Sequence, residues 1–461
     1  MIDKNYNRYY LNNHNNNCSG KDKLKKTIKE INEKIEDGNA VVMTADELCD
    51  IVRNYGEDEV KVEDVDVVTA ATRGLMSGTF NIFSINVEER NVFRKAKKIS
   101  LNGIPGYAGP CPNERLGLVE CIVYGTGVSE EKPNEYGGGH LFRDILEGKA
   151  IDCFIKTIEE KEIRKEITKD DIEFAKLVAT RNSFKNYMAF TNKRNDSVKT
   201  IFHVKDFEGP LKEITVSGCG EINPLEKDPT FSAIGIGTKI LINGAVGYVM
   251  GTGTRSYKAR PNLSVFGKFL EMDPHYMGGF ITSAGPEVVN SIAIPIPVLN
   301  EHILNQLKVI DKNVELPVGE IHDRVAFQTS DYSKVWQNVD LTIKADFDLC
   351  DQPRSLCIPW SEIKQRRRPC IILDICPMKP YMYNEENEFD LTNCYHCGSC
   401  LPCPENVFSA NLGSIMIEDK LVPITLRQSD RYTALKLAEE LKNKIIEKEF
   451  YLSEPLEKIK H

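Results

Sequence analysis

The stretch Val65-Asp-Val-Val-Thr-Ala-Ala71, which continues as Thr72-Arg-Gly-Leu-Met-Ser-Gly78, carries the main signal for the fold. Its first half is a short apolar run rich in β-branched residues, which is typical of a buried strand. Its second half is a glycine-rich turn, and many α/β proteins bind a ligand at a turn that follows a buried strand. The stretch therefore predicts a buried strand that leads into a binding site.

Helical and strand signals alternate on both sides of this stretch. Apolar residues from Leu24 to Ile35 recur at helical spacing and stop at Gly38, and Thr44-Ala-Asp-Glu47 has the form of a capping box at the start of a second helix. The segment 170–187 shows helical spacing and is predicted as a helix.

Two hairpins and a closing helix are predicted further along the chain. Asn243-Gly244 lies between two aliphatic runs, as in a type I′ turn, and Glu418-Asp419 separates two further apolar segments. Ser429 is predicted to cap an amphipathic helix that ends near Lys448. This mixture predicts an α/β or α+β fold and leaves the strand order open.

Composition excludes several classes of protein. The 461 residues include 41% hydrophobic and 28% charged residues, which is enough for a large core, and the net charge is −9. An acidic chain is a poor partner for nucleic acid, because phosphate binding needs a basic surface. The longest apolar run, Ile292–Leu299, is too short to cross a membrane, and the first residues lack an export signal. We expect a cytoplasmic protein with no nucleic-acid or membrane partner.

Cysteine placement is the strongest chemical signal. Eight of the 14 cysteines fall between Cys350 and Cys403. Cys394-Tyr-His-Cys397-Gly-Ser-Cys400 has the spacing of a triplet that grips one side of an iron–sulfur cube. An upstream Cys376-Pro377 makes the region resemble half of a bacterial two-cluster ferredoxin, in which a Cys-Pro cysteine completes the other motif. By this resemblance Cys376 joins the triplet around one [4Fe–4S] cluster.

Alternatives to this ligand set remain at the level of sequence. No triplet precedes Cys376, so Cys403 is either left over or replaces Cys376 as the fourth ligand. Four cysteines also suit a structural zinc ion, although zinc sites usually use two separated pairs. Cys350 and Cys357 can form a second redox or metal pair.

Several glycine-rich and proline-rich motifs, taken in order, resemble those of one family. The chain is similar to the homocysteine-biosynthesis (HcyBio) family of anaerobic archaea and bacteria, and most similar to its metalloprotein branch known as methanogenesis marker protein 16. The motifs that carry the resemblance are Ala40-Val-Val-Met-Thr-Ala-Asp-Glu-Leu48, Asp66-Val-Val-Thr69, Ile104-Pro-Gly-Tyr-Ala-Gly109, Tyr136-Gly-Gly-Gly-His140, Asn223-Pro-Leu-Glu-Lys-Asp-Pro229, Ile234-Gly-Ile-Gly-Thr-Lys239, Ile294-Pro-Ile-Pro-Val-Leu-Asn300 and Phe450-Tyr-Leu-Ser-Glu-Pro455.

The resemblance implies sulfur transfer in sulfur metabolism. Members of the family are expected to convert L-aspartate semialdehyde into homocysteine, with sulfur carried on a cysteine and electrons from a ferredoxin-like partner. In this chain the ferredoxin-like part is fused, and an electron-donor or sulfur-donor protein is a further expected partner. The family pattern implies a cysteine after Met76, where this chain has Ser77. Since a serine cannot carry a persulfide, either another thiol acts or the reaction differs.

Candidate catalytic and binding residues lie in the glycine-rich turns. Cys219 sits between two glycines that can expose its sulfur, Cys111 lies in a proline-flanked loop, and each has a packed, non-catalytic alternative. His140 can shuttle protons, and Glu221 can act as a base. For a small anionic metabolite the candidate binding residues are Arg73, Ser77 and Arg255.

These inferences divide the chain into four parts. A polar tail covers residues 1–22, and a large glycine-rich domain of the HcyBio type covers 23–365. The ferredoxin-like segment covers 366–412, and residues 413–461 form a hairpin and helix that pack back on the main domain. The function expected first is iron–sulfur-dependent sulfur transfer in a methanogen. The alternative is an electron-transfer or maturation protein linked to methanogenesis that turns over no metabolite.

Overall fold

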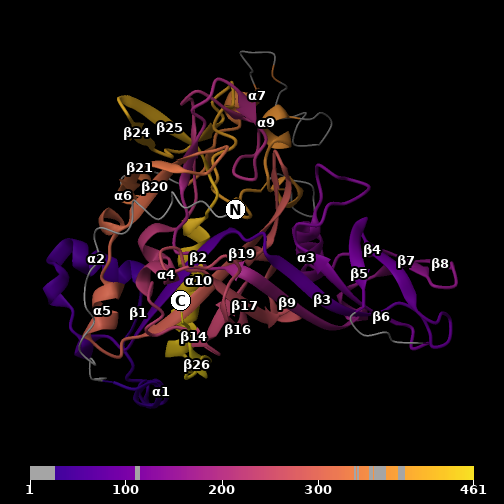
Figure 1. Cartoon of the computed structure of the whole chain (residues 1–461), viewed down its shortest axis with the longest axis horizontal. Coiled ribbons are helices and arrows are strands. Elements are labelled where there is room, and N and C mark those ends of the chain that lie inside the picture. Colours follow the sequence, from indigo (N-terminus) through magenta and orange to yellow (C-terminus); the bar gives the residue numbers. More distant parts are fainter. Residues whose placement is uncertain are drawn as a thin grey trace.

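The computed structural model describes residues 26–109, 115–336, 339, 342–351, 357, 370–382 and 390–460. The predicted tail at 1–22 and the candidate Cys111 lie outside these ranges. A long twisted sheet forms the body of the molecule (Figure 1). Its strands, in spatial order, are β1 (Val42–Thr44), β2 (Val67–Leu75), β19 (Gly285–Pro297), β15 (Lys239–Ile242), β16 (Ala245–Thr252), β17 (Leu263–Lys268), β9 (Ile172–Asn182), β3 (Thr79–Asn86), β6 (Leu118–Tyr124), β5 (Ile104–Ala108), β4 (Ala96–Leu101), β7 (Ile151–Thr157) and β8 (Glu162–Ile167), with β18 (Gly278–Thr282) paired to β19.

A second sheet collects strands from distant parts of the chain. Its β10–β20 and β13–β25 pairs are parallel, whereas in the long sheet only β1–β2 is parallel among the described strands. The mixed α/β class is therefore confirmed, and the predominance of antiparallel pairs makes it the α+β variety. The second sheet runs β21 (Ala326–Asp331), β20 (Glu315–Glu320), β10 (Ala189–Thr191), β13 (Ile214–Val216), β25 (Lys420–Arg427) and β24 (Ser414–Ile417).

Short elements complete the described fold. Three two-stranded ribbons pair β11 (Ser197–Val198) with β12 (Phe207–Glu208), β14 (Gly235–Ile236) with β26 (Glu457–Lys458), and β22 (Lys344–Ala345) with β23 (Phe408–Ser409). The α-helices are α1 (Ile28–Asp37), α2 (Ala45–Tyr55), α3 (Gly138–Leu146), α4 (Pro224–Lys227), α5 (Glu301–Leu307), α6 (Ser333–Trp336), α7 (Asp348–Asp351), α9 (Ile371–Asp374) and α10 (Arg431–Ile446).

Strand β2 is the centre of the core, as its apolar sequence predicts. Every residue from Val67 to Gly74 is buried, because β1 and β19 flank the strand and α10 packs across it. The strand continues to Leu75, so the predicted glycine-rich turn shrinks to 76–78. The side chains of residues 72–75, which the sequence predicts to lie in a loop, therefore point alternately to the two faces of the sheet.

Local capping and turn chemistry is confirmed at several places. Thr44 and Glu47 form the predicted capping box at the start of α2, and Gly38 ends α1 in the left-handed region with φ of 74°. Asn243 and Gly244 connect β15 to β16 with φ of 49° and 81°, as a type I′ turn requires. The hairpin around Glu418 is present as β24 and β25.

The helix predicted at 170–187 is wrong. Ile172–Asn182 is strand β9, which lies between β3 and β17 and hydrogen-bonds to both. Leu177 and Ala179, two positions apart, are fully buried, so period-two alternation decides the buried face. Pairing on both edges satisfies the backbone of this segment and overrides a local helical pattern.

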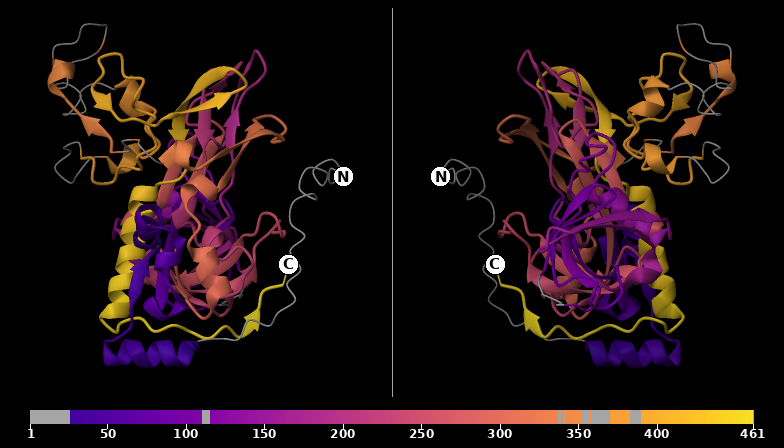
Figure 2. Two further views of the ribbon diagram at one scale, coloured as in Figure 1. Left: turned by 90° about the vertical axis from the view of Figure 1, so that its left-hand side faces the viewer. Right: turned by 90° about the vertical axis from the view of Figure 1, so that its right-hand side faces the viewer.

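The last helix begins one residue later than predicted. Asp430, and not Ser429, caps α10, because its carboxylate accepts a hydrogen bond from the Thr433 amide. Ser429 instead accepts a hydrogen bond from the Gly218 amide at 2.8 Å. Figure 2 shows α10, in yellow, lying along one side of the main body. The carboxyl-terminal helix is thus part of the main core and touches the loop that holds Cys219.

The cysteine-rich segment forms a lobe at one corner of the molecule (Figure 2). The lobe contains the ribbon of β22 and β23 and the short helices α7 and α9. After β23 the chain continues into β24 and β25. Within the part of the chain that the structure describes, no helix combines the length and apolar character needed to cross a membrane.

Replacing Leu437 by alanine tests the packing of α10. Leu437 is fully buried in the core that α10 shares with β2, so we expect the Leu437→Ala variant to lose about 3 kcal/mol of unfolding free energy in denaturant titrations. Leu421→Ala is the matched control, because Leu421 is 60% exposed and its removal leaves no cavity. Equal losses for the two variants would contradict this packing.

Candidate functional site

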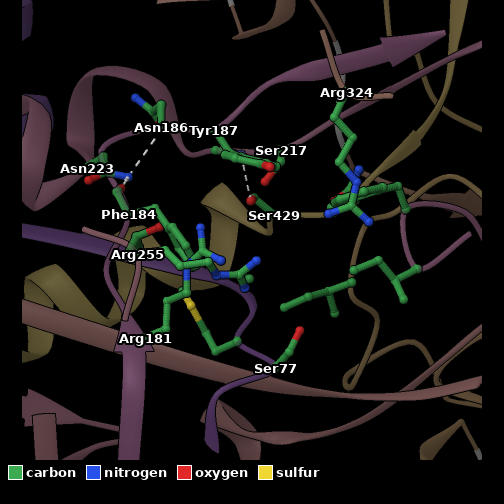
Figure 3. Close-up of a pocket in the computed structure, with 18 residues that line it drawn as sticks. Ser77, Arg181, Phe184, Asn186, Tyr187, Ser217, Asn223, Arg255, Arg324 and Ser429 are labelled. Atoms are coloured by element: carbon green, nitrogen blue, oxygen red, sulfur yellow. Dashed lines mark hydrogen bonds between the residues drawn. The ribbon is translucent and has the colours of Figure 1, made fainter. Parts of the chain in front are cut away.

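A cavity of about 110 Å³ opens where β2 ends, and its wall combines residues of β2 and β9 with loops that adjoin strands of the second sheet. Ser77 and the end of β2 form one side, and Ser429 with Gly218 forms another. Three arginines, Arg181, Arg255 and Arg324, complete the lining. Figure 3 shows the three arginine side chains and Ser77 around the same space. The predicted site at the end of this strand is therefore a real cavity, and Ser77 and Arg255 lie in it.

The three arginines have no carboxylate partner in the described part of the chain. None of the three forms an ion pair with another described residue, and the Nε of Arg181 is buried without a hydrogen-bond partner. Burial lowers the pKa of Arg181, and the positive charges of Arg255 and Arg324 lower it further. Such an uncompensated positive cluster favours an anionic ligand, above all a carboxylate that can accept paired hydrogen bonds.

Aromatic rings hold two of these arginines in position. The Arg181 guanidinium lies 4.7 Å from the centre of the Phe184 ring, and that of Arg324 lies 4.8 Å from the centre of the Phe202 ring. Cation–π contact orients a guanidinium without neutralising its charge. The charges therefore stay available to the cavity.

Amide side chains fix the loop that forms the other wall. Asn186 Nδ2 donates to the Gly220 carbonyl at 2.9 Å, and its Oδ1 accepts from the Gly220 amide at 3.1 Å. Gly220 has φ of 66°, and a Cβ there would lie 2.2 Å from Asp311 Oδ1, so only glycine fits. The loop is therefore held rigidly beside the cavity.

Cys219 lies behind this wall and not on it. Its side chain is fully buried, with Sγ 3.5 Å from Thr72 Oγ1 and 3.7 Å from the Arg73 carbonyl oxygen. Burial raises the pKa of Cys219 to about 11, so the thiol is neutral near pH 7. Thr72 and Gly218 do line the cavity, so one layer of atoms separates the sulfur from it.

A buried glutamate that the sequence analysis did not single out lies beside Ser77. Burial raises the pKa of Glu287 on β19 above its ordinary value, and a hydrogen bond from the Ser77 hydroxyl opposes that shift. Its Oε2 is buried without a hydrogen-bond partner. The available signal was a lone acid directly before the apolar pair Val288-Val289. Ser77 and Glu287 together can exchange a proton with a bound ligand.

Arg73 points away from the cavity. Its neighbours Thr72 and Gly74 line the cavity, and alternation along β2 directs Arg73 to the opposite face. There its guanidinium donates to the His275 carbonyl at 2.7 Å and lies 3.6 Å from Asp430. The structure does not bring Arg73 together with Arg255.

His140 and Glu221 also lie outside the cavity. His140 is fully buried between the rings of Tyr136 and Tyr381, and burial lowers its pKa to about 3. Glu221 is buried and paired with Arg53 and Arg431; burial tends to raise its pKa, but these cations lower it below the ordinary value overall. In this conformation His140 is a neutral packed ring and Glu221 is a structural anion.

Four of the clustered cysteines gather in the lobe. Burial raises the pKa of Cys376 and of Cys400, and the charges of the other thiols in the set raise it further. The set consists of Cys376, Cys394, Cys397 and Cys400. Cys403 interacts with Cys370 instead. No three ligand side chains of the described residues converge closely enough to hold a single metal ion.

Protein polar groups already point at these sulfurs. The His396 amide donates to Cys394 Sγ at 3.3 Å, and the Ser399 hydroxyl oxygen lies 3.4 Å from Cys397 Sγ. Four thiols, Cys397 buried and the other three half-buried, with hydrogen-bonding groups around them suit an iron–sulfur cube, in which each thiolate binds a separate iron atom. The donor set therefore fits the cofactor that the sequence predicts.

Comparison with known proteins gives the family. The model of the homocysteine biosynthesis enzyme, sulfur-incorporation family (HcyBio) matches residues 40–452, so the chain belongs to this family. No solved structure matches it. An uncharacterized protein of Methanothermobacter thermautotrophicus is 41% identical over 92% of this chain and 94% of its own length, and one of Methanocaldococcus jannaschii is 43% identical over 89% and 98%.

A relative with a named activity covers most of the chain. The L-aspartate semialdehyde sulfurtransferase of Methanocaldococcus jannaschii is 33% identical over 345 residues, which is 70% of this chain and 65% of that protein. The protein of the same name in Methanosarcina acetivorans is 32% identical over 63% of this chain and 58% of its own length.

The buried carboxyl of Glu226 makes stability depend on pH. Burial raises the pKa of Glu226 to about 7, and its Oε1 accepts from Asn186 behind the cavity wall. Between about pH 4.5 and 7 the unfolded chain loses this proton while the folded chain keeps it, so the unfolding free energy falls as pH rises. Relative to Glu226→Gln, the wild type should lose about 3 kcal/mol across this range.

Urea titrations of the two proteins at the ends of the range measure this effect. Glu320→Gln is the control, because the pKa of Glu320 is lowered and its contribution is complete near pH 5. A difference between wild type and Glu226→Gln that stays constant with pH would contradict the assignment.

Proposed function

We propose that this chain is an iron–sulfur-dependent sulfurtransferase that binds a small carboxylate-bearing aldehyde, with L-aspartate semialdehyde as the first candidate. The observation that carries the proposal is the cavity with three arginines that lack a carboxylate partner in the described structure. Membership of a family of sulfur-incorporating enzymes supports it, and so do the relatives named for that substrate.

The chemistry needs both sulfur and electrons. Exchange of the aldehyde oxygen for sulfur releases water and gives a thioaldehyde, and two electrons with two protons then reduce the thioaldehyde to the thiol of homocysteine. If sulfur arrives as a cysteine persulfide, two further electrons and two protons release it as sulfide and restore the thiol. An electron carrier fused to the binding domain meets this requirement.

The residues of the cavity take distinct parts in this scheme. Arg181, Arg255 and Arg324 bind the carboxylate and orient the aldehyde, and the low dielectric of the cavity strengthens that contact. Ser77 and Glu287 provide protons for the departing oxygen. Cys219 is the candidate sulfur carrier, because the residues that cover it, Thr72 and Gly218, belong to the wall.

For the cofactor we propose one [4Fe–4S] cluster held by Cys376, Cys394, Cys397 and Cys400. The packing of Cys376 with Cys394 and Cys397 in one apolar cluster supports Cys376 as the fourth ligand in place of Cys403. Such a cluster supplies electrons one at a time when bound. A reduced electron-carrier protein is the partner that this chemistry needs, and we place the protein in the reducing cytoplasm.

A second candidate function rests on the thiols of the site. Ser77 stands in the cavity where the family pattern implies a cysteine, and Cys219 is a buried neutral thiol. If neither carries sulfur, the chain binds an anionic metabolite and serves electron transfer or maturation of a partner without turning the metabolite over.

Removing one arginine of the cavity tests the ligand. We expect Arg255→Ala to weaken binding of L-aspartate semialdehyde by roughly 10- to 100-fold, because a charged hydrogen bond contributes about 1.5–3 kcal/mol. Calorimetric titration of the anaerobically purified chain measures the affinity. Arg164→Ala is the matched control, since Arg164 is 67% exposed on β8, far along the sheet. Equal affinities in all three proteins would exclude this ligand or this cavity.

Replacing Cys219 separates the two candidate functions. If Cys219 carries the sulfur, Cys219→Ala should lower homocysteine formation by roughly 100-fold or more without changing the affinity for the aldehyde. Gas chromatography of the products and the calorimetric titration provide the two readouts. Cys121→Ala, which removes another fully buried thiol, is the control. Unchanged turnover in Cys219→Ala would rule out the carrier role, and absence of turnover in the wild type would favour the second function.

A further inference from the structure

The cysteines of the lobe fall into two sets. The inner set is the four residues Cys376, Cys394, Cys397 and Cys400 discussed above. A different group, Cys350, Cys370 and Cys403, shares an apolar core with Ile343, Ile372, Leu373, Val407 and Phe408. Cys350 and Cys403 are buried there, and the thiols of Cys370 and Cys403 interact electrostatically. Three thiols from well-separated parts of the sequence therefore meet in a second place.

The chain crosses between the two sets in a specific way. Cys376, which is followed by Pro377, comes from the segment of Cys370 but lies with the downstream triplet. Cys403, which is followed by Pro404, comes from the segment of the triplet but lies with Cys370. In two-cluster ferredoxins the Cys-Pro cysteine of each run ligates the cluster of the other run. The observed exchange is the same, although the spacing upstream of Cys376 is much longer.

We infer that the lobe binds a second [4Fe–4S] cluster, held by an outer set of Cys350, Cys357, Cys370 and Cys403. The cube needs four thiolates, and Cys357 is the remaining cysteine of the same upstream run. The apolar side chains around Cys350 and Cys403 exclude water from such a cluster, which is the environment that iron–sulfur centres need.

Zinc is the other metal that four thiolates hold. A tetrahedral zinc ion requires all sulfurs around one point at about 2.3 Å from it. A cube places each thiolate on its own iron atom. The exchange of the two Cys-Pro cysteines between the runs is the ferredoxin pattern, and this exchange favours the cube.

The positions of the two sets define a direction for electron flow. The inner set lies against the main body. The ring of Tyr395, next to Cys394, has its centre 5.1 Å from that of the Phe280 ring on β18, and the Ile281 amide donates to the carbonyl of Pro377, next to Cys376. Of the outer set, Cys350 lies in α7 and Cys370 directly precedes α9 (Figure 1), and Cys403 shares their apolar core with Phe408 of β23. Cys394 and Cys400 also pack against the core of the outer set, so the two sets are neighbours.

This arrangement makes the lobe a relay. When bound, the outer cluster would accept one electron from a reduced carrier protein, which is oxidised, and would pass that electron to the cluster held by the inner set. No covalent bond changes in either step. The relay rests on the function proposed above, whereas the second cluster does not depend on it.

Metal analysis and EPR of the anaerobically purified full-length chain test the inference. We expect about eight iron and eight sulfide per chain, and a dithionite-reduced EPR signal broadened by interaction between two clusters. About four iron with an unbroadened signal would overturn the second cluster and leave the first in place. Absence of iron would overturn both, and zinc without additional sulfide would replace the second cluster by a zinc ion. Because these measurements use the wild type, they decide the question even where a variant does not fold.

Variants assign the ligands. Cys403→Ala and Cys370→Ala should each reduce iron to about half and give the unbroadened signal of the inner cluster. Cys397→Ala should halve the iron and leave the signal of the outer cluster. Cys153→Ala removes a buried thiol of strand β7 outside both sets and should retain the full iron content. Full iron and an unchanged signal in Cys403→Ala would contradict the exchanged ligand pattern, and Cys403→Ser, which keeps an oxygen ligand, should shift the g values.

Discussion

A buried charge network around Arg431 joins the two ends of the chain and supports the site. Arg431, at the start of α10, contacts Asp311 at 2.7 Å and Glu221 at 3.0 Å. Glu221 and Asp311 also accept hydrogen bonds from each other's backbone amides. Removing one partner from such a network leaves an unpaired buried charge, which costs about 3–5 kcal/mol. The network keeps the loop of Cys219 against the carboxyl-terminal helix. It thereby fixes the positions of Ser429 and Asp430, which directly precede that helix.

The same helix start connects the two chemical regions of the molecule. Ser429 binds the Gly218 amide at the cavity, whereas Asp430 lies 3.6 Å from Arg73 and 3.3 Å from His396, inside the cysteine triplet. Tyr395 adds a hydrogen bond to the Gln428 carbonyl at 2.8 Å. Residues 428–430 therefore contact both the cavity wall and the cysteine triplet.

Three cations that share one space without a carboxylate partner among the described residues distinguish the cavity. Arg431 has Asp311 beside it, whereas Arg181 has other arginines and aromatic rings around it. Keeping like charges together costs folding free energy, and an anionic ligand would recover that cost on binding. This contrast, more than the volume of the cavity, identifies it as a binding site.

Local patterns in the sequence determined the elements whose chemistry is contained within a few residues. The Thr44 capping box, the Asn243-Gly244 turn and the burial of β2 follow from neighbours in the chain, and the spacing of the cysteine triplet predicts a cluster site. Tertiary structure decided the rest, because long-range pairing overrides local preference. It turned 172–182 into a strand, directed Arg73 out of the cavity, brought Arg181 and Arg324 into it, and packed Cys403 into one apolar core with Cys350 and Cys370. Each of these outcomes depends on contacts between residues far apart in sequence, and periodicity and motif spacing contain no information about such contacts.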